Sequence, residues 1–306
     1  MTFGRELVDS LAAKVVGRRR EIEQLVAALS AGRHLLLEGP PGTGKSTLLR
    51  AVAEASGRGF EFVEGNAELT PGRMIGTFDP AAVLESGYSA DVFLDGPLTA
   101  ALREGSLLYI EEINRIPEET LNVVITVMSE GELHIPRLGH VVADPGFRLV
   151  AAMNPFDAVG TARISGAVYD RVCRLAMGYQ ATSDELTIVK RRAERAQTAG
   201  DAVFVGQAVD LARATRSHAD LRTGSSVRGA IDLTLLAAGL ADLRGCSYSD
   251  ADVTRDAAQM SLSGRVRVRE GCGRTAEEIV DELWRKFFDI GDTDAPPPPE
   301  RLQGKV

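Results

Sequence analysis

The residues with the clearest chemical meaning form a glycine-rich run, GPPGTGKS, at residues 39–46. An apolar run at residues 35–37 precedes it and a helical pattern follows it, which is the strand–loop–helix context of a phosphate-binding P-loop. The glycines allow tight backbone conformations close to an anion, and the loop N–H groups together with the helix N-terminus can surround phosphates. We expect Lys45 to reach the β- and γ-phosphates of a nucleotide and Ser46 to help hold Mg²⁺.

Two adjacent carboxylates, Glu111 and Glu112, follow a second apolar run at residues 107–110. A P-loop needs acidic partners for its metal ion and for the attacking water. We predict that Glu111 contacts Mg²⁺ through water and that Glu112 orients or deprotonates the nucleophilic water. The alternative is a solvated pair of glutamates after a strand, which the P-loop upstream in the same expected sheet disfavours.

Three further polar residues lie where they could complete such a site. Asn154 follows the apolar run at residues 147–153, so its amide could bind the attacking water or the γ-phosphate. Arg171 precedes another expected strand, and Arg228 opens a long expected helix. Phosphoryl transfer depends on positioning and charge stabilisation, so arginines near the γ-phosphate have large effects. An isolated arginine has a surface role by default.

The elements that would position these residues alternate between strands and helices. Helical spacing covers residues 17–29 and 118–130, and the apolar runs indicate five strands. The expected strands are residues 35–37, 60–64, 106–110, 147–153 and 173–177. This alternation predicts an α/β fold with a parallel five-stranded sheet between helices.

Two segments interrupt that regularity, and a different pattern follows. Residues 69–96 contain scattered Gly and Pro, and residues 132–144 indicate a hairpin with its tip at Leu138-Gly139-His140. Both are insertions of the kind that carry function on a rigid scaffold. The stretches 184–197, 205–216, 226–243, 250–262 and 276–288 have helical patterns, which predict a small all-helical domain. The proline-rich end should be an extended tail.

The composition bounds the class of protein. The chain has 306 residues, of which 44% are hydrophobic and 25% charged, an ordinary soluble composition. The net charge of −8 disfavours a broad nucleic-acid or membrane-surface role. Three cysteines without C-x-x-C spacing argue against a disulfide framework or a zinc cluster. With no apolar signal stretch and no run long enough to cross a bilayer, we expect a cytoplasmic protein.

Taken in order, the motifs resemble those of the MoxR-type AAA+ ATPases. The matching segments, over roughly residues 10–265, are VGR at 16–18, GPPGTGKST, YIEEINR, AAMNPFDAVGT, YDR and SSVRG. The resemblance implies an AAA+ core over residues 1–179, a helical lid over 180–290 and a tail over 291–306. It identifies residues 69–96 with the helix-2 insert and residues 132–144 with the pre-sensor-1 hairpin.

The resemblance also implies site residues, cofactors and partners. Asn154 corresponds to sensor 1, Arg171 to the finger that reaches a neighbour's ATP, and Arg228 to sensor 2. The cofactors would be ATP and Mg²⁺, with residues 15–18 lining the adenine pocket. The nucleotide-binding set is then Val16, Gly17, Pro41, Gly42, Thr43, Gly44, Lys45, Ser46 and Thr47. The chain would form a ring, usually a hexamer, and act on a protein client together with a von Willebrand factor A domain partner.

The sequence departs from the family pattern at one position, because the usual Asp-Glu pair is here Glu111-Glu112. A glutamate is one methylene longer, and positioning errors of about 1 Å can cost on the order of a hundredfold in rate. This substitution motivates a second hypothesis, a nucleotide-gated scaffold with slow turnover. A third hypothesis is a nucleic-acid motor, which the acidic chain and a hairpin carrying only Arg137 and two histidines disfavour.

Overall fold

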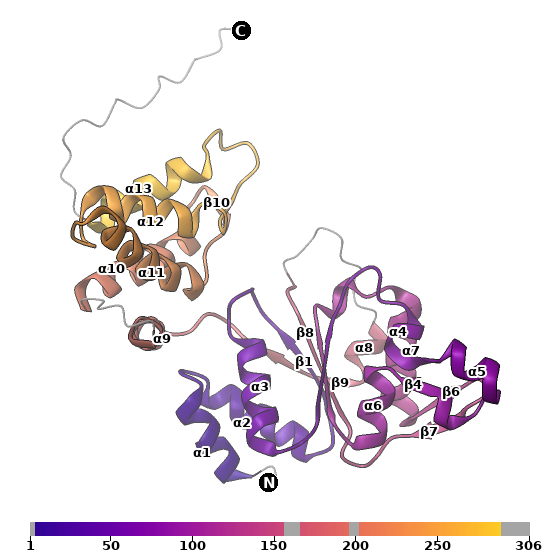
Figure 1. The fold of residues 1–306 in the computed structure, drawn as a ribbon. Coiled ribbons are helices and arrows are strands. Elements are labelled where there is room, and N and C mark those ends of the chain that lie inside the picture. Colours follow the sequence, from indigo (N-terminus) through magenta and orange to yellow (C-terminus); the bar gives the residue numbers. More distant parts are fainter. Residues whose placement is uncertain (1–3, 156–165, 196–201, 289–306) are drawn as a thin grey trace, which may run out of the picture. The chain divides into compact units, whose positions relative to one another are not determined.

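The computed structural model describes residues 4–155, 166–195 and 202–288 (Figure 1). The chain divides into two compact units, Met1–Asp184 and Glu185–Val306. The predicted tail at 291–306 lies outside the described residues. Among those described, no helix is both long and apolar enough to cross a membrane.

The first unit is built on a parallel five-stranded sheet with the strand order β2-β5-β8-β1-β9. The bounds are His34–Glu38 (β1), Phe60–Glu64 (β2), Leu107–Glu111 (β5), Arg148–Met153 (β8) and Val172–Ala176 (β9). The three central strands are apolar on both faces, as expected for a parallel sheet covered by helices. The predicted sheet is therefore confirmed, with most strand ends shifted by about one residue.

Alternate side chains of the sheet face two separate hydrophobic layers. Leu35 and Leu37 pack with the helices α1, α2 and α3, whereas Leu36 packs with α6 and α7 on the opposite face. Figure 1 shows these two groups of helices on either side of the strands. The helix bounds are Arg5–Lys14 (α1), Arg19–Ser30 (α2), Lys45–Ser56 (α3), Pro97–Glu104 (α6) and Glu118–Glu130 (α7). The sequence reading missed α1, although its buried Leu7, Val8 and Leu11 have helical spacing.

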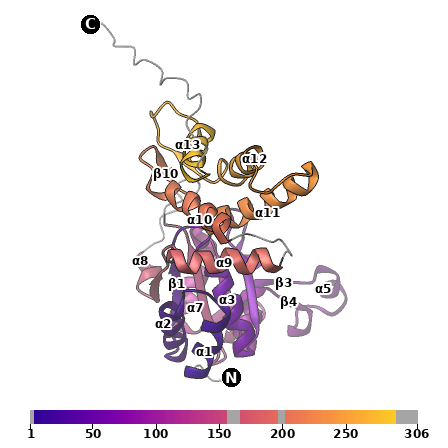
Figure 2. The same ribbon diagram turned by 90° about the vertical axis from the view of Figure 1, so that its left-hand side faces the viewer.

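The two predicted insertions both form ordered structure. The first contains the helices α4 and α5 and an antiparallel pair, β3–β4, and the second is the hairpin β6–β7. Their bounds are Pro71–Ile75 (α4), Gly76–Phe78 (β3), Pro80–Ser86 (α5), Phe93–Asp95 (β4), Glu132–Ile135 (β6) and Gly139–Val142 (β7). Figure 2 shows β3, β4 and α5 extending away from the sheet.

The hairpin tip differs from its prediction. The turn consists of residues 136–138, because Gly139 and His140 already pair with Ile135 and His134 in the ladder. Arg137 takes a left-handed conformation in this turn, with φ of 69°. The predicted tip at Leu138-Gly139-His140 was therefore two residues too far along the chain.

The second unit is mainly helical. Its core is formed by α9 to α13 and includes the buried Trp284, whose indole N–H donates to the Thr254 hydroxyl at 3.0 Å. The bounds are Thr182–Arg195 (α9, which begins in the first unit), Ala202–Ser217 (α10), Val227–Arg244 (α11), Ala251–Leu262 (α12) and Ala276–Phe288 (α13). In addition to the predicted helices, Leu221–Thr223 (β10) and Arg267–Val268 (β11) form a short antiparallel pair.

Candidate functional site

The glycine-rich loop joins the end of β1 to the start of α3. Gly42 and Gly44 have φ of 76° and 87°, a left-handed conformation that favours glycine. Thr43 between them is fully buried, and its hydroxyl donates to the Pro40 carbonyl at 3.0 Å. Pro41 and Thr47 are exposed. The loop is thus a tight turn that ends at the N-terminus of a helix, as an anion-binding loop requires.

The Lys45 side chain folds back over this loop. Its ammonium donates to the Gly39 carbonyl at 2.8 Å and to the Pro40 carbonyl at 3.0 Å, and the residue is buried. The positive charge of Lys45 is therefore held against the first two residues of the P-loop.

A short hydrogen-bonded chain connects the helix to the strand β5. The Ser46 hydroxyl donates to Glu111 Oε1 at 2.7 Å, and the Tyr109 hydroxyl donates to Ser46 Oγ at 3.3 Å. Burial, and then the nearby Glu111 carboxylate, raise the pKa of Tyr109 well above its usual range, so this hydroxyl stays protonated. The sequence prediction brought Ser46 and Glu111 together but gave Tyr109 no role.

Glu112 has a backbone conformation that is rare for a residue with a side chain. Its φ is 53° and its ψ is 44°, and its carboxylate is 3.1 Å from Arg115 Nη1. The end of β2 approaches this point so closely that a Cβ at Gly65 would lie 2.3 Å from the Glu112 carbonyl oxygen. A left-handed turn directly after a buried strand directs Glu112 differently from Glu111, so the two adjacent carboxylates can have different roles.

Asn154 directly follows β8, the strand between β5 and β1 in the sheet. The Gly39 N–H donates to the Met153 carbonyl at 3.2 Å, so the P-loop begins beside the end of β8. Asn154 is partly buried at this edge. Parallel strands end at the same edge of a sheet, so Asn154 shares that edge with Glu111 and the P-loop, where open α/β sheets bind ligands.

The two predicted arginines lie in different units. Arg171, between α8 (Gly166–Tyr169) and β9, donates from Nη1 to the Ala167 carbonyl at 2.9 Å and from Nε to the Ser129 hydroxyl. Arg228 is exposed in the first turn of α11, where its backbone N–H donates to the capping Ser226 hydroxyl at 3.4 Å. Their roles as finger and sensor 2 remain predictions.

The segment before the P-loop contributes a buried charge. Val16 and Gly17 lie between α1 and α2, with Val16 partly buried. The adjacent Arg18 is only 3% exposed, and its guanidinium donates to the Thr43 carbonyl at 2.8 Å and the Gly178 carbonyl at 2.6 Å. Arg18 therefore links the N-terminal segment, the P-loop and the segment after β9. Sequence reasoning counted it in the adenine pocket without foreseeing this link.

A second network, centred on the buried Glu38 and missed by the sequence prediction, lies at the base of the P-loop. Glu38 is 4% exposed, accepts from the Tyr169 hydroxyl at 2.6 Å and pairs with Arg174 Nε. Burial, and then the hydrogen bond to Glu38, raise the pKa of Tyr169 to about 12. A charged residue ending a buried strand is a signal in the sequence, but its partners lie more than a hundred residues further along the chain.

Comparisons with known proteins agree with this geometry. A family model described as AAA domain (dynein-related subfamily) matches residues 34–172. The chain is similar to the protein YeaC of Bacillus subtilis, at 28% identity over 303 residues, 90% of this chain and 91% of YeaC. It is also similar to the gas vesicle ATPase GvpN2 of Halobacterium salinarum, at 28% identity over 281 residues, 87% of this chain and 77% of GvpN2.

Among solved structures, a variant of Thermotoga maritima RuvB has the same fold, with a TM-score of 0.58 at 21% identity. The likeness covers 82% of this chain and 72% of the RuvB chain. With the P-loop, the acidic strand end and the strand order, these matches define the class of protein: residues 34–172 match an AAA domain, and the chain has the fold of the AAA+ P-loop NTPases. Its assignment to the MoxR type stays a prediction.

Proposed function

We propose that this chain is a ring-forming, Mg²⁺-dependent ATPase of the MoxR type that uses ATP hydrolysis to remodel or mature a protein partner. The observation that carries the proposal is the meeting of Ser46 and Glu111, at 2.7 Å, beside the P-loop. Here a helix N-terminus, a buried lysine and a carboxylate lie together where the strands end, and Asn154 shares that edge.

The residues present suit a nucleotide with Mg²⁺. Mg²⁺ prefers oxygen ligands, keeps several waters, and takes few protein ligands when phosphates supply the others. The Ser46 hydroxyl and the Glu111 carboxylate are such oxygens, and the described residues contain no cluster of three or more His, Cys, Asp or Glu that would hold a different metal. Bound Mg²⁺ would neutralise charge on the β- and γ-phosphates, and Lys45 would bind the same phosphates.

In this proposal the remaining residues act on the water and the developing charge. Glu112 would orient or deprotonate the attacking water, and Asn154 would hold it in line. Arg228 and a neighbouring subunit's Arg171 would stabilise negative charge on the transferred phosphoryl group. The extra methylene of Glu111 does not separate its carboxylate from Ser46, which supports efficient hydrolysis over a nucleotide-gated scaffold with slow turnover.

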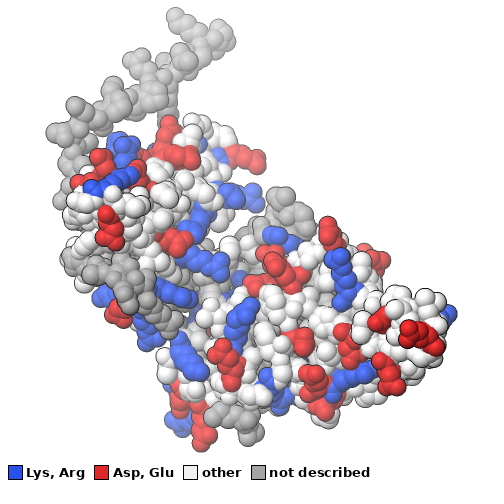
Figure 3. Space-filling view, in the orientation of Figure 1, with Lys and Arg blue, Asp and Glu red and all other residues white. Residues whose placement is uncertain are grey.

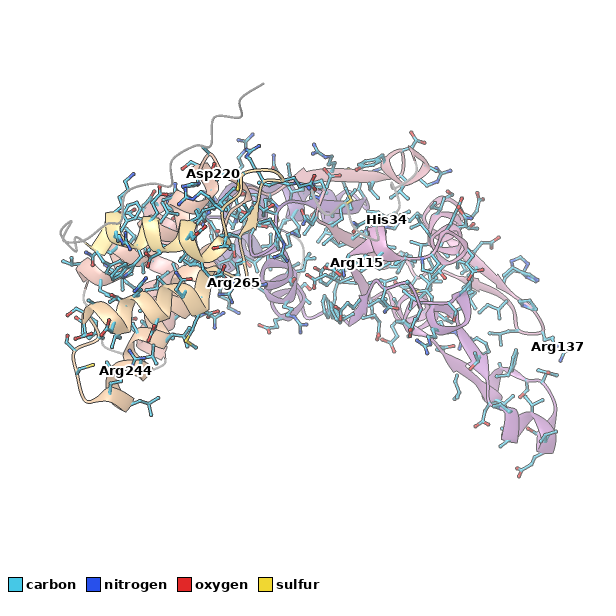
Figure 4. All side chains as sticks on the ribbon, turned by 90° about the horizontal axis from the view of Figure 1, so that it is seen from above. His34, Arg115, Arg137, Asp220, Arg244 and Arg265 are labelled. Carbon is cyan, nitrogen blue, oxygen red and sulfur yellow. The ribbon has the colours of Figure 1, made fainter. Side chains whose placement is uncertain are left out.

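The choice of a protein partner rests on the surface of the two insertions, which we call the insert surface. It comprises α5, β3–β4 and β6–β7, and its exposed apolar side chains include Leu84 (89% exposed), Leu94 (58%) and Val142 (67%). Arg137, seen at the outer end in Figure 4, lies 3.9 Å from the centre of the Tyr88 ring. In the view of Figure 3 the end that carries α5 is mostly uncharged and acidic. Such a surface suits an apolar protein segment better than a phosphate backbone.

A trapping experiment tests this proposal. Glu112→Gln should bind ATP without hydrolysing it, and the loaded ring should retain a protein partner, for which a von Willebrand factor A domain protein is the first candidate. Adding Leu84→Asp and Leu94→Asp should abolish capture. The matched control is Leu243→Asp, a similarly exposed leucine of α11, which should leave capture intact.

Three results would contradict the proposal. Capture that is the same with ADP as with ATP, or unchanged by the Leu84 and Leu94 substitutions, would refute the ATP-dependent use of the insert surface. Nucleic-acid binding with a steep dependence on salt, without protein capture, would favour the motor hypothesis.

A further inference from the structure

The side chain of Tyr109 has a position that the proposed function does not use. It lies on the face of β5 that also carries Leu107, and it packs in the same apolar layer as Leu48 and Leu49 of α3. The residue is completely buried. A buried tyrosine normally requires a partner for its hydroxyl, and here the partner is Ser46, a residue of the proposed metal site.

We propose that the Tyr109 hydroxyl is a positioning group that orients Ser46 and Glu111 toward the metal ion. By fixing these two side chains it allows the longer glutamate at position 111 to serve in the metal site. This inference rests on the proposed function, because it concerns the same site. Tyr109 acts through its neighbours, and no contact between Tyr109 and the nucleotide is needed.

The direction of the hydrogen bonds supports this role. The Ser46 hydroxyl has one proton, which it donates to Glu111 Oε1 at 2.7 Å, and it accepts from the Tyr109 hydroxyl at 3.3 Å. With one lone pair engaged by Tyr109 and the proton directed at Glu111, the other lone pair of Ser46 Oγ has a defined direction. Donation of the proton to Glu111 raises the electron density on Ser46 Oγ, and the hydrogen bond from Tyr109 strengthens that donation because successive hydrogen bonds polarise one another.

Packing fixes the hydroxyl in place. The Tyr109 ring packs against the aromatic rings of Phe60 and Phe62 in β2, with centroid distances of 6.2 Å and 5.6 Å. The ring therefore cannot move without disturbing two neighbours. A glutamate has one more rotatable bond than an aspartate and so loses more conformational freedom when it is held in one position. The fixed hydrogen bonds from Tyr109 through Ser46 therefore matter more for metal binding when position 111 is Glu.

The test is Tyr109→Phe, which keeps the ring and removes only the hydroxyl. Binding of Mn²⁺ to the ATP-loaded Glu112→Gln protein, followed by electron paramagnetic resonance, gives a readout that does not depend on turnover. We expect the half-saturating Mn²⁺ concentration to rise about five- to tenfold, the size of one lost hydrogen bond. Affinity for ATP in EDTA should stay within twofold, which separates positioning from general damage to the fold.

Two companion variants sharpen the result. Tyr169→Phe removes another tyrosine hydroxyl, the one bound to the buried Glu38, and should leave the Mn²⁺ half-saturation unchanged. Glu111→Asp draws the carboxylate back by about one C–C bond, roughly 1.5 Å. Tyr109→Phe should therefore matter less when position 111 is aspartate. In the Glu111→Asp background it should change the logarithm of the half-saturating Mn²⁺ concentration by less than half as much as it does when Glu111 is present.

The outcomes distinguish this inference from the proposed function. Suppose that the Glu112→Gln protein binds ATP and Mn²⁺, but adding Tyr109→Phe leaves the half-saturating Mn²⁺ concentration within twofold. The positioning role is then wrong, and the proposed ATPase site stands. Fully additive effects of Tyr109→Phe and Glu111→Asp would also overturn the role. If the Glu112→Gln protein with Tyr109 intact shows no Mn²⁺ binding in the presence of ATP, the proposed metal site is wrong and the inference fails with it.

Discussion

The stability of the first unit should depend on pH through His34, the first residue of β1. The His34 Nδ1 accepts from the Leu149 N–H at 3.0 Å, so the folded state requires a ring that is unprotonated at this nitrogen. Burial, and then the positive charges of Arg148 and Arg33, lower the pKa of His34 from 6.5 to about 4. This contact joins β1, which leads into the P-loop, to β8, which leads to Asn154.

The sign and size follow from the two pKa values. A histidine with a lowered pKa in the folded state contributes its full stability above pH 6.5 and loses it as the pH falls toward 4, because the unfolded chain binds the proton more readily. Between pH 7 and pH 5 the linkage relation gives a loss of about 2 kcal/mol of unfolding free energy from this residue. Below pH 4 the loss approaches about 3 kcal/mol.

The assay compares the parent protein with His34→Asn, whose side-chain oxygen can accept from the Leu149 N–H but does not titrate. Urea unfolding followed by circular dichroism at pH 7 and pH 5 would give the two free energies, with the transition of the first unit identified by its shift with ATP. His218→Asn, in the second unit, is the control. Equal losses of stability in the parent and in His34→Asn would refute the reasoning.

Two other substitutions test contacts around the nucleotide site. Arg18→Leu should lower the unfolding free energy by about 3 kcal/mol, because the buried Thr43 carbonyl and the Gly178 carbonyl both lose their charged donor. It should also weaken ATP binding measured with a fluorescent nucleotide, and normal binding would show that Arg18 does not hold the P-loop. Arg171→Ala subunits should lack turnover alone, yet hydrolyse ATP in mixed rings with Lys45→Ala subunits, whose Arg171 is intact. Full turnover of Arg171→Ala alone would show that this arginine only binds Ala167 and Ser129 locally.

The parts of the fold that could be predicted from the sequence are those set by continuous local patterns. The apolar runs that became β1, β5 and β8 are buried on both faces, so each appears as an unbroken hydrophobic stretch. The P-loop has fixed spacing, and its neighbours in the sheet follow from parallel topology. Ser46 and Glu111 could therefore be assigned to one site although 65 residues separate them.

The parts that could not be predicted depend on register and on distant partners. The contact of the Tyr109 hydroxyl with Ser46 depends on how closely α3 packs against β5. A local sequence pattern does not determine that packing distance. The pairing of Glu38 with Tyr169 joins residues 131 positions apart. The pair β10–β11 is too short for a strand pattern, and the hairpin turn was misplaced because Arg137, not only glycine, adopts a left-handed conformation.

The central claim is that this site hydrolyses ATP, and Mg²⁺-dependent phosphate release by the purified full-length protein tests it most directly. We predict steady turnover by the parent protein and a loss of at least about a hundredfold in Glu112→Gln, the lower end for removing a general base. Glu112→Gln should keep its ATP affinity, whereas Lys45→Ala should lose both binding and turnover. Tight ATP binding without phosphate release by the parent protein, or undiminished turnover in Glu112→Gln, would contradict the account.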